Sequence, residues 1–291
     1  MNEEKTSKNI LPHYSREEFD KIIEESNNSL IDAYSRMDMS NQAWTKYTSR
    51  EVDYIEKHIP SKDSIIVDIG CGTARHIAEL YSRGYHNIYG YDFSSKIIDR
   101  AKGNNPNIKD HLYIQDCRTL ESNIKADVVL CLYDVIGSFA NEEDNLAIIK
   151  AIKNITKKDS IVLSSVMNFE LTYHIAKYIY NVYEEQDRFF NMPLTSNNMQ
   201  KTGNVFNPDL FVIDSTTHII YRRELFINEN NEETQYLVRD RRYTMEQIKK
   251  MFSKQGFSVV ASRYVQAGRW DIPLTNIDSK AKEILLVLKK E

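Results

Sequence analysis

The sequence is poor in cysteine and has no long apolar run. Its three cysteines, Cys71, Cys117 and Cys131, lack the spacing of a zinc site or a disulfide framework, so we interpret them as buried thiols. No stretch of about 18 apolar residues occurs, and the polar start of the chain does not resemble a signal peptide, so we expect no membrane span. The net charge of -4 lacks the basic excess of proteins that coat nucleic acid. These absences predict a cytoplasmic protein and disfavour a nucleic-acid partner, but they leave a local basic patch open.

Strand-like and helix-like segments alternate over residues 65–167. Strands are predicted at 65–69, 87–92, 111–115, 126–132 and 160–167, with helices at 73–83, 95–102 and 141–156. Strands separated by helices pair in parallel, with right-handed crossovers. A helix from Thr244 to Gln255 and strands at 257–264 and 284–289 follow, and the spacing of these two strands suits a hairpin. We therefore predict an α/β fold with a doubly wound, mostly parallel, seven-stranded sheet and an antiparallel edge strand.

Two regions lie outside this alternation. Residues 1–60 are predicted as an N-terminal helical flank, with helices at 15–26, 29–37 and 43–58. Residues 168–243 interrupt the sheet with a tyrosine-rich helix at 169–183, an irregular stretch at 184–207 and β-hairpins at 210–240. We expect the core to comprise residues 61–167 and 244–291, and residues 168–243 to form an α+β insertion after the fifth strand.

A glycine-rich turn follows the first predicted strand. The apolar run ends in Asp68, and Gly70 and Gly72 come just before residues that can begin a helix. Glycine tolerates positive φ, and the free N–H groups of a helix start attract an anionic group. The turn therefore predicts a nucleotide-like cofactor. A dinucleotide-binding fingerprint would need a third glycine at position 75, which is Arg75, so that fingerprint is absent.

Two more carboxylates, Asp92 and Asp116, come at the ends of the next two strands. The carboxyl ends of adjacent parallel strands meet at the crevice where such sheets bind ligands. Asp92 lies twenty residues beyond Gly72 and suits hydrogen bonds from both hydroxyls of a ribose.

This ordered set of motifs resembles the class I S-adenosylmethionine-dependent methyltransferases, from about residue 43 to 167 and again from 244 to 290. The matching motifs are Asp-Ile-Gly-Cys-Gly-Thr at 68–73, Tyr-Asp-Phe-Ser at 91–94, Gln-Asp-Cys at 115–117 and Leu-Tyr-Asp at 132–134, with Ala74 where glycine is common. The resemblance implies a Rossmann-like methyltransferase fold, S-adenosyl-L-methionine as cofactor and S-adenosyl-L-homocysteine as product.

The resemblance also assigns cofactor contacts. The turn at 70–72 would contact the methionine part and the ribose, Asp92 the ribose hydroxyls, and Phe93 the adenine. The adenine edge would be recognised by Asp116 and the backbone of Cys117, and the sulfonium would lie between Leu132 and Tyr133. The full set of predicted cofactor-binding residues is Asp68, Gly70, Cys71, Gly72, Asp92, Phe93, Asp116, Cys117, Leu132 and Tyr133.

Methyl transfer from a sulfonium is an in-line displacement, so the enzyme mainly aligns the reactants and excludes water. A base is needed only when the acceptor must lose a proton. The candidate catalytic residues are Tyr133, Asp134 and His174. The alternatives are that Asp134 caps the turn before Gly137 and that His174 is a packed or solvated histidine. A bound metal is not expected, because Asp134 and Asn168 only partly match a metal-assisted site.

The acceptor is less well specified. The chain lacks the Asn-Pro-Pro-Tyr motif of base-amine methylation and the Pro-Cys nucleophile of pyrimidine methylation. What remains resembles the small-molecule N- and O-methyltransferases, in which an insertion after the fifth strand covers the pocket. The resemblance thus implies N- or O-methylation of a small molecule and a lid formed by residues 168–243. Within the insertion, Arg239 and Arg241 share one face of a strand and, with Tyr243, are predicted to bind an acidic or phosphorylated acceptor. Arg222 and Arg223 would face opposite sides of their own strand. The alternative is that most arginines of the insertion form ion pairs with Glu224, Asp240 or nearby acids on a solvated surface.

Two other functions stay open. An RNA or protein methyltransferase could use the Arg239–Arg242 cluster, and a non-catalytic module could bind S-adenosylmethionine for regulation. The sequence leaves open whether the chain is a monomer or a homodimer.

Overall fold

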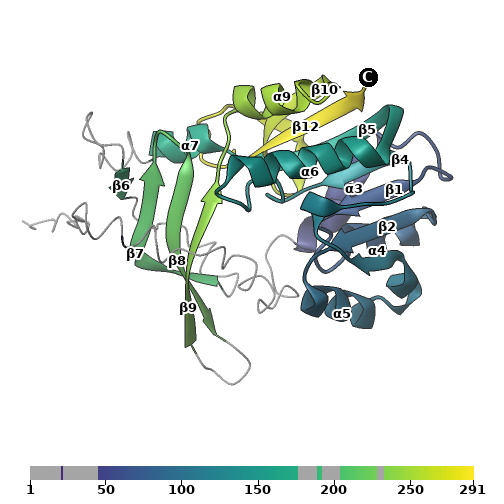
Figure 1. Cartoon of the computed structure of the whole chain (residues 1–291), viewed down its shortest axis with the longest axis horizontal. Helices are drawn as coiled ribbons and strands as arrows, with labels where there is room; N and C mark the ends of the chain where they lie inside the picture. Colours follow the sequence, from purple (N-terminus) through teal and green to yellow (C-terminus); the bar gives the residue numbers. More distant parts are fainter. Residues whose placement is uncertain (1–20, 22–44, 176–188, 192–203, 228–232) are drawn as a thin grey trace, which may run out of the picture.

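The computed structural model describes residue 21 and residues 45–175, 189–191, 204–227 and 233–291 (Figure 1). The helices predicted at 15–26 and 29–37 therefore lie outside the described residues, apart from Lys21. The helix predicted at 43–58 appears as a 3-10 turn, η2 (Thr45–Tyr47), followed by α3 (Thr48–Glu56). None of the helices in the described part of the chain is long and apolar enough to cross a membrane.

The main sheet has eight strands in the order β11-β10-β12-β5-β4-β1-β2-β3. Its parallel strands are β1 (Ile66–Ile69), β2 (Ile88–Asp92), β3 (Leu112–Ile114), β4 (Ala126–Cys131) and β5 (Thr156–Met167). On the other side of β5 lie β12 (Glu283–Lys290), β10 (Phe257–Gln266) and β11 (Arg269–Leu274), each antiparallel to its neighbour. The predicted α/β, mostly parallel fold is confirmed.

The predicted number of strands is wrong, because the sheet has eight strands and not seven. The predicted antiparallel edge strand is present as β11, which the sequence did not locate, and β12 lies inside the sheet between β5 and β10. Strand β11 contains Pro273, which breaks a strand pattern in the sequence, but an edge strand tolerates proline because one side of its backbone needs no partner.

Helices cover both faces of the main sheet, and side chains alternate between the two cores (Figure 1). One core packs Val67 and Ile69 against α6 (Glu142–Ile155) and α9 (Met245–Ser253). The opposite core packs Ile66 of the same strand against α3, α4 (Arg75–Ser82) and α5 (Ser95–Asn104). The three cysteines are buried in these cores, as predicted. Two further 3-10 turns are η3 (Pro106–His111) and η4 (Cys117–Thr119).

The insertion forms a second, antiparallel sheet in the order β6-β7-β8-β9 beside the main sheet (Figure 1). It begins with α7 (Phe169–His174) and contains β6 (Phe189–Asn191), β7 (Asn204–Asp214), β8 (Ile219–Ile227) and β9 (Glu233–Arg241). The helix predicted at 169–183 is described only as far as residue 175. The chain returns next to the end of β5, where the N–H of Phe169 donates to the carbonyl of Tyr243 over 2.9 Å. The insertion is thus attached at the carboxyl edge of the main sheet.

Candidate active site

The turn after β1 has the conformation that its glycines allow. Gly70 and Gly72 have φ of +70° and +54°. A Cβ on Gly70 would lie 2.3 Å from Cγ2 of Val135, so a side chain there would clash. A Cβ on Gly72 would meet no atom within 4 Å, so the turn faces open space at that point. Only the left-handed backbone then requires glycine at Gly72, and the open side leaves room for a ligand.

Asp92 is tied to this turn. One oxygen of its carboxylate accepts a hydrogen bond from the N–H of Gly72, and the other accepts from the N–H of Ser94, both over 3.0 Å. Burial raises the pKa of this carboxyl, although the two backbone hydrogen bonds oppose the effect. A carboxylate has about four lone-pair sites, so Asp92 can accept further hydrogen bonds from a ligand.

Two buried polar atoms next to the turn have no hydrogen-bond partner among the described residues. They are Oδ2 of Asp68, at the end of β1, and Nη2 of Arg75, at the start of α4. Burial raises the pKa of Asp68 to about 8, the charge of Arg75 opposes this rise, and the charge of Asp92 adds to it. Unpaired buried polar groups are costly, so an acceptor and a donor held together in this way indicate a site for a ligand that carries both charges.

Glu51 of α3 is the centre of a buried network that the sequence did not reveal. Its fully buried carboxylate accepts hydrogen bonds from Arg75 Nη1 over 2.6 Å, His76 Nε2 over 2.9 Å, the N–H of Gly268 over 2.8 Å and the hydroxyl of Tyr133. Burial alone would raise the pKa of Glu51, but the hydrogen bond from His76 and the charge of Arg75 hold it at about 2. Glu51 is therefore ionised at neutral pH.

His76 is the neutral member of this network. Burial and the nearby charge of Arg75 lower the pKa of His76 to about 4, against the opposing contact with Glu51. Because an ionised carboxylate only accepts hydrogen bonds, a neutral His76 must donate its Nε2–H to Glu51. The only clue in the sequence is that Glu51 precedes Val52 and lies one turn from Ile55, two buried residues of the same helix.

The chain makes a tight turn after β4, where Tyr133 and Asp134 both have positive φ, of +59° and +66°. The N–H of Tyr133 donates to Ser165 Oγ over 2.8 Å, and the guanidinium of Arg75 lies 4.6 Å from the centroid of its ring. One oxygen of Asp134 accepts from the N–H of Met167 over 3.3 Å. Burial and the charge of Glu283 raise the pKa of Tyr133 well above its usual range. Tyr133 is thus protonated at neutral pH and acts as a hydrogen-bond donor.

A second buried carboxyl, Glu283, begins β12 next to the end of β5. Burial, assisted by the charge of Glu51, raises its pKa to about 7, although a hydrogen bond with Ser165 opposes the shift. Its Oε2 has no partner within the described ranges. Sequence reasoning missed Glu283 because the only signal was an acid at the start of an apolar strand.

Comparisons with known proteins agree with this geometry. Residues 66–159 match a family model described as a methyltransferase domain. The chain therefore contains a methyltransferase domain. The predictions of a methyltransferase and of S-adenosylmethionine as its cofactor are confirmed.

The relatives are distant. A ubiquinone biosynthesis O-methyltransferase of Neisseria meningitidis serogroup C (strain 053442) is 27% identical over 124 residues, which are 40% of this chain and 50% of that protein. The chain thus matches about half the length of this curated relative. An S-adenosylmethionine-dependent methyltransferase from Clostridium acetobutylicum ATCC 824 has a TM-score of 0.58 at 15% identity, over 90% of this chain and 98% of that one. The CcbJ methyltransferase from Streptomyces caelestis has a TM-score of 0.62 at 10% identity, over 84% and 89%. These two structures show a shared fold.

The residues predicted to contact the ribose and the adenine lie at adjacent strand ends of the methyltransferase domain. Asp92 ends β2 and Phe93 follows it, and Asp116 follows β3, which pairs with β2. The carboxylate of Asp116 caps η4 and forms an ion pair with Arg118 over 2.6 Å, and Cys117 is buried. Their cofactor contacts stay predictions, and Asp116 would have to share its carboxylate with Arg118.

The predicted acceptor-binding arginines are largely engaged inside the protein. Arg241 Nε donates to the carbonyl of Ala140 over 3.0 Å and its Nη1 to the carbonyl of Thr217 over 2.7 Å. Tyr243 is buried in the core beneath the insertion, and Arg239 Nε is buried without a partner in the part of the chain that the structure describes. Arg241 therefore fastens the insertion to the domain. The alternative pairing with Asp240 is seen at Arg242, over 3.6 Å.

The two remaining catalytic candidates lie on different elements. His174 lies at the end of α7, partly exposed, and Asp134 lies at the turn after β4. Among the described residues, no group of histidines, cysteines and acids could hold a metal ion. The catalytic roles of Asp134 and His174 stay predictions.

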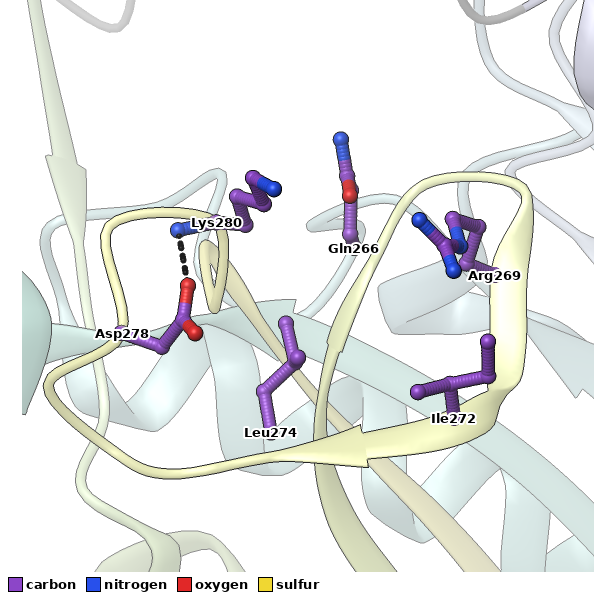
Figure 2. Close-up of a pocket in the computed structure, with 6 residues that line it drawn as sticks. All are labelled: Gln266, Arg269, Ile272, Leu274, Asp278 and Lys280. Carbon is purple, nitrogen blue, oxygen red and sulfur yellow. Dashed lines mark hydrogen bonds between the residues drawn. The ribbon is translucent and has the colours of Figure 1, made fainter.

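A small pocket of about 220 Å³ lies on the β10–β11 hairpin (Figure 2). In this view, the side chains of Gln266, Arg269 and Lys280 lie along one side of the pocket, and those of Ile272 and Leu274 along the other. Asp278 completes the lining, and its carboxylate accepts from the N–H of Lys280 over 2.8 Å. The turn of the same hairpin contains Gly268, which donates to Glu51. The pocket therefore lies on the hairpin whose turn contacts the buried network.

Proposed function

We propose that the chain transfers a methyl group from S-adenosylmethionine to a nitrogen or oxygen atom of a small, acidic acceptor. The observation that carries this proposal is the glycine turn after β1, which is tied to Asp92 and flanked by the unpaired atoms of Asp68 and Arg75. Together they form one site for a ribose and for a group with both charges.

The donor set suits the cofactor. S-adenosylmethionine has an ammonium and a carboxylate at its methionine end and two ribose hydroxyls. Oδ2 of Asp68 can accept from the ammonium, and Nη2 of Arg75 can donate to the carboxylate. The free lone pairs of Asp92 can accept from the ribose hydroxyls. The ammonium would also favour the ionised form of Asp68, which burial otherwise disfavours.

When bound, the cofactor supplies an electrophilic methyl group. The residues of the chain then align the acceptor and exclude water, since no covalent enzyme intermediate is needed. An ammonium or alcohol acceptor must also lose a proton. Asp134 is the proposed proton acceptor, because it follows β4 directly, whereas Tyr133 is held in its protonated form.

The pocket on the β10–β11 hairpin supports an acidic acceptor. It brings two cations, Arg269 and Lys280, to a cavity that also has the aliphatic side chains of Ile272 and Leu274. Neither cation forms an ion pair with any residue that the structure describes. Arg241, by contrast, binds backbone carbonyls. A carboxylate or phosphate of the acceptor would therefore bind Arg269 and Lys280.

Calorimetric titration with S-adenosylmethionine tests the donor site. We expect the wild-type chain to bind it and Asp92→Asn to bind it at least ten-fold more weakly, because an amide is a poorer acceptor for the ribose hydroxyls. Asp110→Asn, an exposed residue of η3, is the matched control and should bind like the wild type. Unchanged affinity in Asp92→Asn would contradict the proposed donor site.

A further inference from the structure

The carboxylate of Glu51 joins four segments that are far apart in the sequence. It lies on α3 and accepts hydrogen bonds from the start of α4, from the turn after β4 and from the β10–β11 turn, 217 residues away at Gly268. The carboxylate of Glu51 is fully buried, and its partners Arg75 and Tyr133 are only slightly exposed. A charge that is buried with this many donors has a specific role or a high cost.

We propose that Glu51 is a positioning residue of the methyl-donor site, which holds Arg75 and Tyr133 in place and balances the charge of Arg75. This inference rests on the proposed function. It adds a residue of the N-terminal helix, outside the glycine turn and the strand ends, to the machinery of methyl transfer.

The geometry of Arg75 supports this role. Its Nη1 donates to Glu51 over 2.6 Å and to Thr48 Oγ1 over 3.0 Å, so both contacts of this atom are with α3. The guanidinium then lies over the ring of Tyr133, and Nη2 is left free near Asp68. Helix α3 therefore determines where the free end of Arg75 points.

The backbone conformation at Tyr133 also supports the positioning role of Glu51. Two successive residues other than glycine, Tyr133 and Asp134, have positive φ, which costs about 1–3 kcal/mol for each residue. Such a turn persists only where its surroundings hold it. Ser165 accepts from the N–H of Tyr133, and Glu51 accepts from its hydroxyl. Glu51 thus holds the side chain of a strained turn that follows β4 directly.

Charge provides a test that does not need the acceptor. S-adenosylmethionine carries a positive charge on sulfur, whereas S-adenosylhomocysteine has a neutral thioether. Glu51→Gln removes the partner charge of Arg75, so the unpaired guanidinium would repel the sulfonium and not the thioether. A simple packing defect would weaken the binding of both ligands by the same factor.

The experiment is calorimetry on the full chain with both ligands. We expect Glu51→Gln to raise the Kd of S-adenosylmethionine at least ten-fold and that of S-adenosylhomocysteine at most three-fold. The matched control is Glu56→Gln on the same helix, because Glu56 pairs with Arg83 over 2.6 Å and with Lys62 over 3.0 Å at a partly exposed site. This control should leave both Kd values unchanged.

Two more variants keep the test valid if Glu51→Gln does not fold. Arg75→Gln leaves the charge of Glu51 without its cationic partner and should shift the ratio of the two Kd values in the opposite direction, in favour of S-adenosylmethionine. The double variant Glu51→Gln with Arg75→Gln has neither charge and should return the ratio to near that of the wild type.

The outcomes separate the two proposals. A wild-type chain that binds neither ligand overturns the proposed function, and this inference with it. A wild-type chain that binds both, combined with a Kd ratio that is unchanged in Glu51→Gln and in Arg75→Gln, overturns the role of Glu51 alone.

Discussion

The proposed donor site has two halves that are built by different means. One half is the glycine turn with Asp68 and Asp92, whose members lie close in sequence and are held by backbone conformation. The other half is the buried network around Glu51, whose members come from both ends of the described chain and are held by charge. Substitutions that add atoms should therefore perturb the glycine turn most. Substitutions that remove a charge or change a protonation state should perturb the buried network most.

The largest effect is expected from Gly70→Ala in the first half. The new Cβ would lie 2.3 Å from Val135, and φ of +70° is unfavourable for alanine. We expect the free energy of unfolding to fall by about 4 kcal/mol, from strain and overpacking together. Urea unfolding measures this change. The control is Gly103→Ala in α5, where a Cβ meets no atom within 4 Å and the helix should gain up to about 1 kcal/mol. Equal stability of the two variants would contradict the close approach at Gly70.

A slightly smaller effect is expected from Glu283→Gln in the second half, and it should depend on pH. The pKa of Glu283 is about 7 in the folded protein and 4.5 in the reference state, so the folded chain binds this proton more tightly. Wild-type stability should therefore fall as pH rises from 4.5 to 7, by up to about 3 kcal/mol for this group. The amide of Glu283→Gln does not titrate and avoids that loss.

Unfolding at pH 5 and pH 8 checks this prediction. Glu283→Gln should be nearly as stable as the wild type at pH 5 and more stable at pH 8. The exposed Glu121→Gln is the control and should show the same difference from the wild type at both pH values. If Glu283→Gln instead loses stability at pH 8, Glu283 is ionised in the folded protein and the burial argument is wrong.

The variant Arg269→Gln tests whether the β10–β11 hairpin, whose turn contacts Glu51, also binds the acceptor. Once a methylated product has been identified by screening acidic metabolites, we expect KM for that acceptor to rise about ten-fold with little change in kcat, because one charged contact is lost. Lys250→Gln, exposed on α9, serves as the control. An unchanged KM in Arg269→Gln would remove this pocket from acceptor binding.

The smallest effect is expected from Ala74→Gly, at the boundary between the two halves. Ala74 is fully buried, has φ of +61° and precedes α4. A left-handed alanine costs about 1 kcal/mol, so glycine should raise the free energy of unfolding by about that amount. Thermal or urea unfolding measures the gain. A loss of stability would mean that the methyl group of Ala74 contributes more to packing than its backbone costs.

The first half could be predicted from the sequence because each of its signals is local. The order Asp68, Gly70, Gly72 and Asp92 predicted the turn, the strand ends and the cofactor, and the alternation of strands and helices predicted the parallel sheet. The one error in the sheet is the missed eighth strand. Strand β11 contains Pro273, which breaks a strand pattern in the sequence. Its pairing with β10 leaves no pattern that can be seen in one segment alone.

The second half could not be predicted in this way. Nothing near Glu51 shows that Arg75, His76, Tyr133 and Gly268 surround it, since an acid on an amphipathic helix is usually solvated. In the same way, Arg241 had the residue type and strand position of an acceptor anchor, but the folded chain uses it to bind Ala140 and Thr217.

The sequence by itself determined the methyl donor, because glycine conformation and the spacing of strand ends are properties of short segments. Only the tertiary structure decided which carboxylates are buried, which arginines form no ion pair with the described residues, and which helix brings Glu51 to the buried network. The physical reason is that the pKa and the partners of a charged group depend on what surrounds it in space, and those neighbours come from every part of the chain.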